Sequence, residues 1–423
     1  MSDTTNNDEH YVQYAQSPAL PTQEAVDGIR YDFNDGARIL IPNNGKQYHV
    51  LLKDVDTGTV MYNRVPDPIT DPDKVTLIVS PKKYFIRYSI QVTEAGGTTP
   101  LFEHTFDATG KDVRIQMPVN TLGDAIAWFS YVERFQQKHN CSVTCVMQPH
   151  IAEIFKEQYP AIRFATIDEV TQDRPYANYY IGLFFDNNPA YQPVDFRHIG
   201  LHEAAAYILG VDTTAIPPRV NLSLPSNTKH TKYVVIATQA SGQAKYWNNP
   251  DGWHTVIKYL RDRGYAVVCI DKNSVYGSNG IYNHIPWGTI DDTGSKPLQD
   301  RINTIKDAAC FIGLGSGLSW LAWCCNVPVV LISGFSSKFT EFPTKYRIHN
   351  HHVCHSCWND IRVKFDNTDF FWCPYHKGTG RAYECTREIQ AKQVIDALED
   401  ILRSDSGKKK FKKKSRKGLE IIK

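Results

Sequence analysis

Strand-like and helix-like segments alternate along two successive stretches of the sequence, and this alternation limits the possible folds more than any other feature. In the first stretch, the strand-like run VRIQMPV precedes a segment from about Asp124 to Lys138, in which Ala125, Phe129, Val132 and Phe135 recur at helical spacing. Further strand-like runs (SVTCVM, IRFAT, YYIGLFF) follow, and a glycine, Gly210, is placed to end the last helix. The pattern predicts an α/β lobe with parallel strands.

The second stretch repeats this pattern after a linker-like segment, RVNLSLPSNTKHT. Strand-like runs (KYVVIATQ, AVVCID, CFIGL, VPVVLIS) alternate with helical segments, one of which places Trp253, Val256, Ile257 and Leu260 on a single face. The sequence therefore predicts two α/β lobes. In such folds ligands bind at the carboxyl ends of the strands, in the cleft between the lobes.

The segments outside the two lobes predict additional modules. Short apolar runs broken by Asp-Gly, Pro-Asp and Gly-Gly predict a small all-β module, a barrel or sandwich, before the first lobe. The predicted divisions are a disordered N-terminus (1–34), a small β-barrel module (35–110), the N-terminal lobe (111–220), the C-terminal lobe (221–345), a four-cysteine metal finger (346–385), a C-terminal helix (386–403) and a basic tail (404–423).

Composition excludes some classes of protein. A chain of 423 residues with 42% hydrophobic residues fits a globular protein of two or three domains. The sequence contains no run of 18 or more apolar residues, so no membrane span is predicted. The polar, acidic N-terminus lacks the pattern of a secretory signal, so we expect a cytoplasmic protein.

The net charge of +2 conceals an uneven distribution of charge. Eight of the ten residues from Lys408 to Lys417 are basic, and without them the net charge falls to about −6. A net negative charge on the rest of the chain is not typical of a nucleic-acid-binding domain. The tail is either a solubilising segment or a contact for nucleic acid, anionic lipid or an acidic partner.

Three predicted loops between a strand and a helix carry candidate site residues. The first, Thr121, Leu122, Gly123 and Asp124, turns into a helix start. A carboxylate at that position either acts as a general base or simply complements the helix dipole.

The second loop, IATQASGQAKYW, follows a buried strand and contains Thr238, Gln239, Ser241 and Lys245. Hydroxyls, backbone amides and one lysine suit a phosphate group, although the spacing is not that of a Walker motif. An ordinary polar loop with a solvated lysine is the alternative.

The third loop contains Gly315, Ser316 and Gly317 between a buried strand and an apolar helix start. Glycines allow the backbone to approach a pyrophosphate closely, and the amino end of a helix favours negative charge.

Four cysteines form the spacing C-x2-C-x15-C-x11-C near the end of the chain: Cys354, Cys357, Cys373 and Cys385. In a reducing compartment such a cluster favours a metal over disulfides. Four thiolates leave no open coordination position, so the predicted site is structural. The ligand chemistry allows zinc or iron.

The order of these motifs resembles that of the bacterial heptosyltransferases, two-lobed (GT-B) glycosyltransferases that use sugar nucleotides. Their Gly-Asp motif matches Gly123-Asp124, and their Thr-loop-Lys-aromatic-Trp motif matches the segment from Thr238 to Trp247. Their Asp-Thr-Gly-Leu-Ser-His motif aligns with Gly315 to Trp320, but here the Asp is replaced by Gly315 and the His by Trp320. The roles of those two side chains are therefore not carried over.

The run GLGSGLSWLAW, the extra N-terminal β module and the four-cysteine segment are more similar to the autotransporter O-heptosyltransferases, over about residues 35–403. The resemblance implies an inverting transfer of heptose from ADP-D-glycero-β-D-manno-heptose to serines of adhesin passenger domains. It implies that Asp124 is the base and that Lys245 and the amides of Gly315 to Gly317 stabilise the leaving ADP. By analogy with nucleotide-binding folds, Asp271 is expected to contact adenosine.

The resemblance also implies one structural Fe³⁺ per chain at the four cysteines, with Zn²⁺ as the alternative, and assembly into a homododecamer. Two other functions remain open, a catalytically inactive nucleotide-binding scaffold and a metal-finger nucleic-acid-binding protein. The negative charge of the body disfavours the second.

Overall fold

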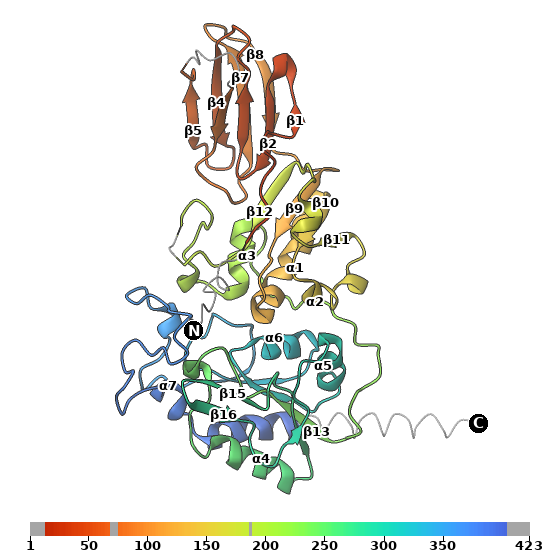
Figure 1. Cartoon of the computed structure of the whole chain (residues 1–423), viewed down its shortest axis with the longest axis vertical. Coiled ribbons are helices and arrows are strands. Elements are labelled where there is room, and N and C mark those ends of the chain that lie inside the picture. The colour runs from red at the N-terminus through yellow and green to blue at the C-terminus, as the bar shows by residue number, and fades with distance from the viewer. Residues whose placement is uncertain (1–12, 68–74, 186–187, 404–423) are drawn as a thin grey trace, which may run out of the picture. The chain divides into compact units, whose positions relative to one another are not determined.

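The computed structural model describes residues 13–67, 75–185 and 188–403, and divides into two compact units (Figure 1). The first unit comprises the chain up to Asn120 together with Trp128–Ile216, and the second comprises Thr121–Ala127 and the chain from Pro217 onward. The first turn of one helix therefore groups with the second unit, which matters for the site described below. The basic stretch 408–417 lies outside the described residues.

The first unit contains a mixed sheet of eight strands. Its path runs β11-β10-β9-β12-β2-β3-β6, with β1 paired to β2. The pairs from β11 to β2 are parallel and the remaining pairs are antiparallel. The strands are β1 (Gln23–Glu24), β2 (Arg30–Asn34), β3 (Arg38–Ile41), β6 (Thr76–Val79), β9 (Asp112–Gln116), β10 (Ser142–Val146), β11 (Ile162–Ala165) and β12 (Ala177–Tyr180). The predicted parallel strands of the first lobe are confirmed.

The helices of this region follow the predicted periodicity. The segment expected from about Asp124 to Lys138 is α1 (Leu122–His139), and its periodic residues Ala125, Phe129, Val132 and Phe135 are fully buried. Gly210 ends α3 (Leu201–Leu209) with φ of 61°, a left-handed conformation that glycine adopts without strain. The short helices are η1 (Val26–Gly28), α2 (Pro149–Ala152), η2 (Lys156–Gln158), η3 (Asp168–Val170) and η4 (Phe196–His198).

A separate antiparallel sheet of four strands, in the order β5-β4-β7-β8, completes the first unit. The strands are β4 (Tyr48–Asp54), β5 (Val60–Arg64), β7 (Tyr88–Glu94) and β8 (Pro100–Thr105). Alternate residues of β4 and β7 are buried, and the facing pairs Val50–Val92 and Leu52–Ile90 form the apolar face. The strands of the predicted 35–110 module thus divide between two sheets, because β3 and β6 extend the lobe sheet, and the small barrel is not confirmed.

Residues 13–34, for which the sequence analysis expects disorder, are bound by buried polar side chains of the lobe. The Gln116 side-chain amide accepts from the Ala15 backbone N–H at 2.8 Å and donates to the Ala15 carbonyl at 3.0 Å. The buried Arg114 guanidinium donates to the Gln16 carbonyl at 2.9 Å. These partners lie about a hundred residues away in the sequence, so local composition could not reveal them.

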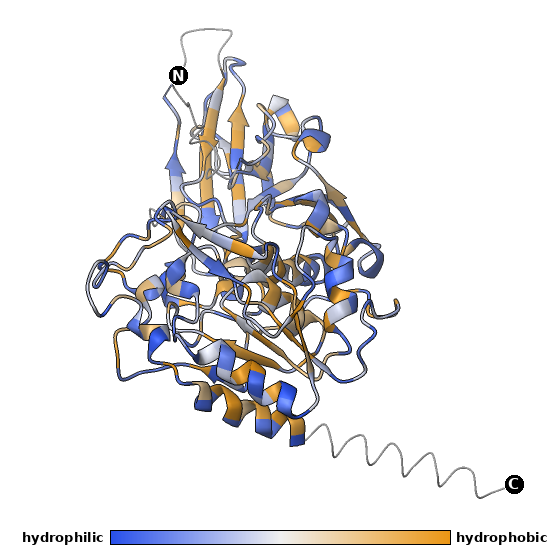
Figure 2. Ribbon diagram, turned by 60° about the horizontal axis from the view of Figure 1, so that its bottom comes forward, coloured by the Kyte–Doolittle hydropathy of each residue, from blue (hydrophilic) through white to orange (hydrophobic). Residues whose placement is uncertain are grey.

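The second unit is built on a six-stranded sheet in the order β17-β14-β13-β18-β19-β20, in which all pairs are parallel. The strands are β13 (Tyr233–Ile236), β14 (Ala266–Cys269), β17 (Ile290–Asp291), β18 (Phe311–Leu314), β19 (Val329–Ile332) and β20 (Tyr346–Ile348), and a hairpin is formed by β15 (Val275–Ser278) and β16 (Ile281–His284). Figure 2 shows hydrophobic residues along the strands, while the helices carry both hydrophobic and hydrophilic residues.

The second unit also contains several helices and single helical turns. They are η5 (Gln243–Lys245), α4 (Gly252–Asp262), α5 (Leu298–Ile305), α6 (Gly317–Cys324), η6 (Cys357–Asn359), α7 (Glu384–Arg387) and a helix over 391–403. Val256, Ile257 and Leu260 of α4 enter the same core as Val394 and Leu398. The C-terminal helix therefore packs on the second lobe, as its amphipathic pattern indicates. No helix in the described part of the chain is long and apolar enough to cross a membrane.

Candidate active site

Asp124 lies in the first turn of α1, at the predicted Gly-Asp turn. The Thr121 hydroxyl donates a hydrogen bond to the Asp124 carboxylate. Burial raises the pKa of Asp124, while the hydrogen bond from Thr121 and the positive charge of Lys245 oppose part of that rise. A half-buried carboxylate with a raised pKa and a cation nearby has the properties of a general base.

Lys245 is the last residue of η5, in the second predicted loop. Its Nζ lies 3.2 Å from the Ser241 hydroxyl and 5.3 Å from the centre of the Phe335 ring. Burial lowers the pKa of Lys245, and the negative charges of Asp124 and Glu341 oppose this shift. The structure therefore brings Asp124 and Lys245, which are far apart in the sequence, close enough for their charges to interact.

The third loop meets the first at Gly317 and meets Glu341 at Gly315. A Cβ atom on Gly317 would lie 2.8 Å from the Leu122 Cβ and 3.0 Å from the Gly123 backbone nitrogen. A Cβ atom on Gly315 would lie 2.7 Å from the Glu341 carboxylate. Glycine is thus required at both positions because neighbouring chain segments occupy the space of a side chain. All of these residues belong to the second unit.

Ser316 precedes α6, but its hydroxyl does not cap the helix. The Ser316 Oγ is buried and has no hydrogen-bond partner among the described residues. A buried hydroxyl beside a helix start needs a partner, and a ligand oxygen would supply one.

A small pocket is lined by Lys245, Gly315 and the loop that follows β19, namely Ser333, Gly334, Phe335 and Ser336. The sequence analysis did not identify this loop. The run SGFSS, which begins at the last residue of the strand-like run VPVVLIS, could have identified it. The other two loops of this lobe also follow a strand in this way.

A buried ion pair holds this loop. Arg347 and Glu341 lie 2.5 Å apart, with side chains that are only 6% and 7% exposed. The Arg347 guanidinium also donates to the Ser333 hydroxyl at 2.9 Å and to the carbonyls of Ser336 and Ser337 at 3.2 and 3.0 Å. The pair therefore positions the pocket-lining loop, and nothing in its local sequence marked it.

Asp271 follows β14, and hydrogen bonds fix its side chain. Its carboxylate is buried and accepts hydrogen bonds from the Thr238 backbone N–H at 2.8 Å, the Thr238 hydroxyl at 2.8 Å and the Gln239 backbone N–H at 3.1 Å. The Gln239 side chain is in turn bound to the Asn273 carbonyl at 2.8 Å. These contacts indicate that Asp271 fixes the start of the Lys245 loop, and its expected contact with adenosine stays a prediction.

The thiols of the four cysteines lie near enough to one another to interact electrostatically. Burial and the neighbouring thiols of Cys354, Cys385 and Cys373 raise the pKa of Cys357, and burial with Cys373 and Cys354 raises that of Cys385 to about 12. Cys354, Cys357, Cys373 and Cys385 are free thiols. Four neighbouring thiols without disulfides have the donor chemistry of a structural metal site.

The cysteine segment packs directly on the pocket. The backbone N–H groups of Ser356 and Trp358 donate to the carbonyls of Gly334 and Phe335 at 2.8 and 3.1 Å. A Cβ atom on Gly334 would lie 2.5 Å from the carbonyl oxygen of Cys385. The loop of the pocket is thus held between the Lys245 loop and the cysteine segment.

Comparison with known families gives two matches. A sequence model described as the N-terminal domain of the glycosyltransferase TibC matches residues 26–96. A model of glycosyltransferase family 9 (heptosyltransferase) matches residues 181–363.

Known relatives match most of the chain. It is 48% identical to the autotransporter heptosyltransferase BAHTCr of Citrobacter rodentium, covering 90% of this chain and 91% of the relative. It is 47% identical to the autotransporter heptosyltransferase TibC of Escherichia coli O78:H11, covering 92% and 93%. A third relative, the inactive autotransporter heptosyltransferase BimC of Burkholderia thailandensis, is 37% identical and covers 94% and 91%.

The fold is also that of TibC. The crystal structure of iron-containing, dodecameric TibC superposes with a TM-score of 0.86 at 46% identity, covering 92% of this chain and 99% of TibC. The same values describe TibC in complex with ADP-D-beta-D-heptose.

Proposed function

The chain belongs to the autotransporter heptosyltransferases and is therefore a glycosyltransferase, and from this premise we propose that it moves heptose from ADP-D-glycero-β-D-manno-heptose to serine hydroxyls of an autotransporter adhesin passenger domain, with inversion. The observation that carries this proposal is the meeting of Asp124 with Lys245 beside the Gly315–Gly317 loop. A base and a cation in one site are what a single displacement needs, one for the acceptor and one for the leaving group.

The proposed reaction is one displacement at the anomeric carbon. The serine oxygen forms a bond to this carbon, while the bond from the carbon to the β-phosphate oxygen of ADP breaks and its electron pair leaves with ADP. The serine proton passes to the Asp124 carboxylate, whose raised pKa favours proton uptake. The negative charge that grows on the pyrophosphate is stabilised by Lys245.

The donor-binding residues proposed here are those that line or adjoin the pocket. Lys245 lines it from one loop, with Ser241 next to the lysine, and Gly315 lines it from the loop that continues through Ser316 to Gly317. The unpartnered Ser316 hydroxyl supports a phosphate contact at this helix start. Thr121, Leu122 and Gly123 shape the turn that carries the base, and Thr238, Gln239 and Asp271 hold the Lys245 loop.

We further propose one structural Fe³⁺ ion per chain, bound by Cys354, Cys357, Cys373 and Cys385, with Zn²⁺ as the alternative. The support is the electrostatic proximity of four free thiols and the iron-containing relative TibC. The ion would tie the cysteine segment together and take no part in the displacement. Assembly into a dodecamer is proposed from the same relative. Free thiols fit a reducing compartment, and we propose the cytoplasm.

The experiment is incubation of the purified protein with ADP-heptose and an adhesin passenger domain, followed by intact-mass measurement of the passenger. We expect one or more heptose additions with the wild-type protein and none with Asp124→Asn. If ADP-heptose binds but no passenger gains mass, the scaffold alternative replaces the proposal, which is relevant because the relative BimC is described as inactive.

A further inference from the structure

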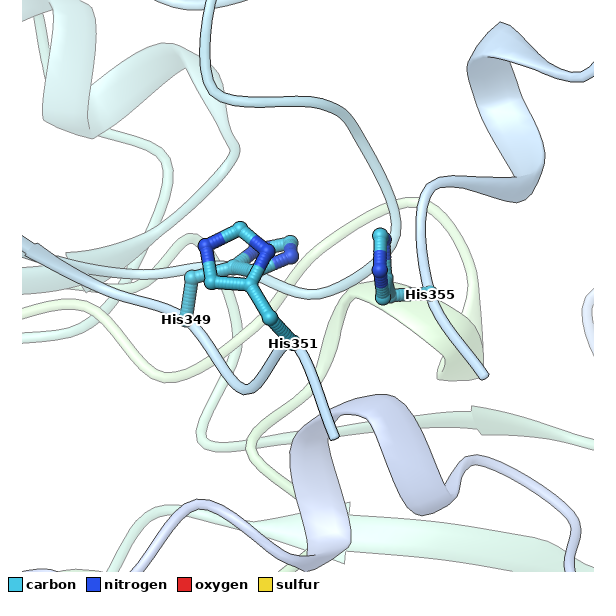
Figure 3. A group of neighbouring side chains, drawn as sticks. All are labelled: His349, His351 and His355. Carbon is cyan, nitrogen blue, oxygen red and sulfur yellow. The ribbon is translucent and has the colours of Figure 1, made fainter. Parts of the chain in front are cut away.

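Three histidines outside the proposed catalytic and cysteine sites converge next to β20 (Figure 3). They are His349, directly after β20, His351, and His355, which lies between the first two cysteines in sequence. Each offers a ring nitrogen, and these three nitrogens lie within 4.8 Å of one another. The ring centres are 4.3, 4.9 and 5.4 Å apart.

The orientation of His349 is set by the strand beside it. Its Nδ1 lies 2.8 Å from the Ser333 carbonyl oxygen, and because a carbonyl only accepts, Nδ1 carries the hydrogen. The lone pair is then on Nε2, which is buried and has no hydrogen-bond partner among the described residues. A histidine that donates to a backbone carbonyl through one nitrogen and keeps the other unpaired is arranged as metal-binding histidines are.

The other two histidines complete the set. His355 Nδ1 lies 2.8 Å from the Ser356 hydroxyl, which leaves its Nε2 as the available ligand atom. His351 is exposed, so an ion can reach the cluster from solvent and the His351 ring is free to rotate. The scaffold beneath them is firm, because the Ser333 backbone N–H donates to the Ile348 carbonyl at 3.0 Å across β19 and β20.

We propose that His349, His351 and His355 bind one divalent transition-metal ion of the zinc class, at a site separate from the four cysteines. Three imidazoles suit Zn²⁺, Ni²⁺, Co²⁺ or Cu²⁺, whereas Mg²⁺ and Ca²⁺ require oxygen ligands. Two nitrogens on one tetrahedral zinc ion are about 3.4 Å apart. The ring nitrogens must therefore move closer together to bind one ion, and this requires rotation of the exposed His351 ring. Three protein ligands leave a fourth position for water.

The ion would connect two parts of the second unit. His349 is anchored to Ser333, a residue of the pocket-lining loop, and His355 belongs to the cysteine segment. Metal binding at the histidines would therefore fasten the cysteine segment to the end of the sheet. This inference does not depend on the proposed transfer reaction.

The test is the total metal content of the full-length protein. Metal bound on purification is measured by elemental analysis, and further Zn²⁺ is then titrated calorimetrically in a buffer that does not chelate metals. We expect two equivalents per chain in the wild-type protein. Mutation of a residue that only supports a metal ligand typically weakens metal affinity by about 10- to 100-fold. Loss of a ligand itself should weaken the affinity of the histidine site by at least about 100-fold. His351→Ala should therefore retain about one equivalent of metal. The matched control is His352→Ala, a neighbouring exposed histidine outside the cluster, which should retain two.

A second measurement identifies the ligands. Co²⁺ added in place of Zn²⁺ should give ligand-field absorption without a thiolate-to-cobalt charge-transfer band, because no sulfur is in the proposed set. A total of one equivalent in the wild-type protein, an equal loss in His351→Ala and His352→Ala, or a thiolate band from the added Co²⁺ would each overturn the proposal. None of these outcomes involves heptose transfer, so they are distinct from a failure of the proposed function.

Discussion

Replacement of Arg347 by leucine should destabilise the second unit and loosen the pocket. Arg347 forms a buried ion pair with Glu341 and three further hydrogen bonds to the loop from Ser333 to Ser337. Removing one partner of a buried pair leaves the other charge unpaired, which typically costs about 3–5 kcal/mol. For a unit of this size each kcal/mol lowers Tm by about 2–4 °C, so we expect a decrease of roughly 6–20 °C.

The assay is thermal unfolding with and without ADP. The control is Arg362→Leu, since Arg362 is paired with Asp360 but its side chain is 76% exposed, and little change in Tm is expected. The double variant with Glu341→Leu should recover much of the lost stability, because no buried charge then lacks a partner. The large decrease in Tm and its recovery in the double variant both follow from the unpaired charge. A decrease in Tm of less than about 3 °C, or a double variant no more stable than Arg347→Leu, would therefore refute the argument.

Four further variants test the proposed site. Asp124→Asn should lower turnover by about 10²- to 10⁴-fold with nearly unchanged ADP-heptose affinity, measured by steady-state kinetics and calorimetry; more than a third of wild-type turnover would disprove the base. Lys245→Ala should weaken ADP binding by about 1.5–3 kcal/mol, roughly 10- to 100-fold, and an unchanged affinity would contradict the phosphate contact. Thr121→Val removes a hydrogen bond that lowers the pKa of Asp124, so this pKa should rise and the acid limb of kcat/KM should move to higher pH, whereas Thr121→Ser should leave it in place. Cys357→Ser should release the metal of the cysteine site and also weaken ADP binding, because the cysteine segment is hydrogen-bonded to the pocket loop; a metal content equal to that of the wild-type protein would exclude Cys357 as a ligand.

Much of the secondary structure was predictable from local patterns. The periodic residues of α1 are all buried, and Gly210 ends α3 in the left-handed conformation that favours glycine. The C-terminal helix enters the core of the second unit through Val394 and Leu398. These features depend on residues within a few turns of one another, so the sequence displays them directly.

The assignment of sheets was not predictable in the same way. Residues 35–110 show strand-like runs separated by turn signals, which fit a small barrel as well as the two sheets observed. Strand pairing with the lobe decides between these arrangements, because β3 pairs with β2 and β2 lies parallel to β12. Likewise, Gln116 and Arg114 order residues near Ala15 through contacts across about a hundred positions.

The sequence by itself determined the strand–loop–helix order, the loops that carry Asp124, Lys245 and Gly315, and the four-cysteine spacing, because each is a pattern of neighbouring residues. The tertiary structure decided which of these residues meet. It brought Asp124 within electrostatic range of Lys245, bound the Asp271 carboxylate to Thr238, and paired Glu341 with Arg347. It also brought the ring nitrogens of three histidines close together, although their local sequence does not mark them as a site. Such contacts depend on how strands stack in a sheet, and strand order leaves no mark on the residues that it brings together.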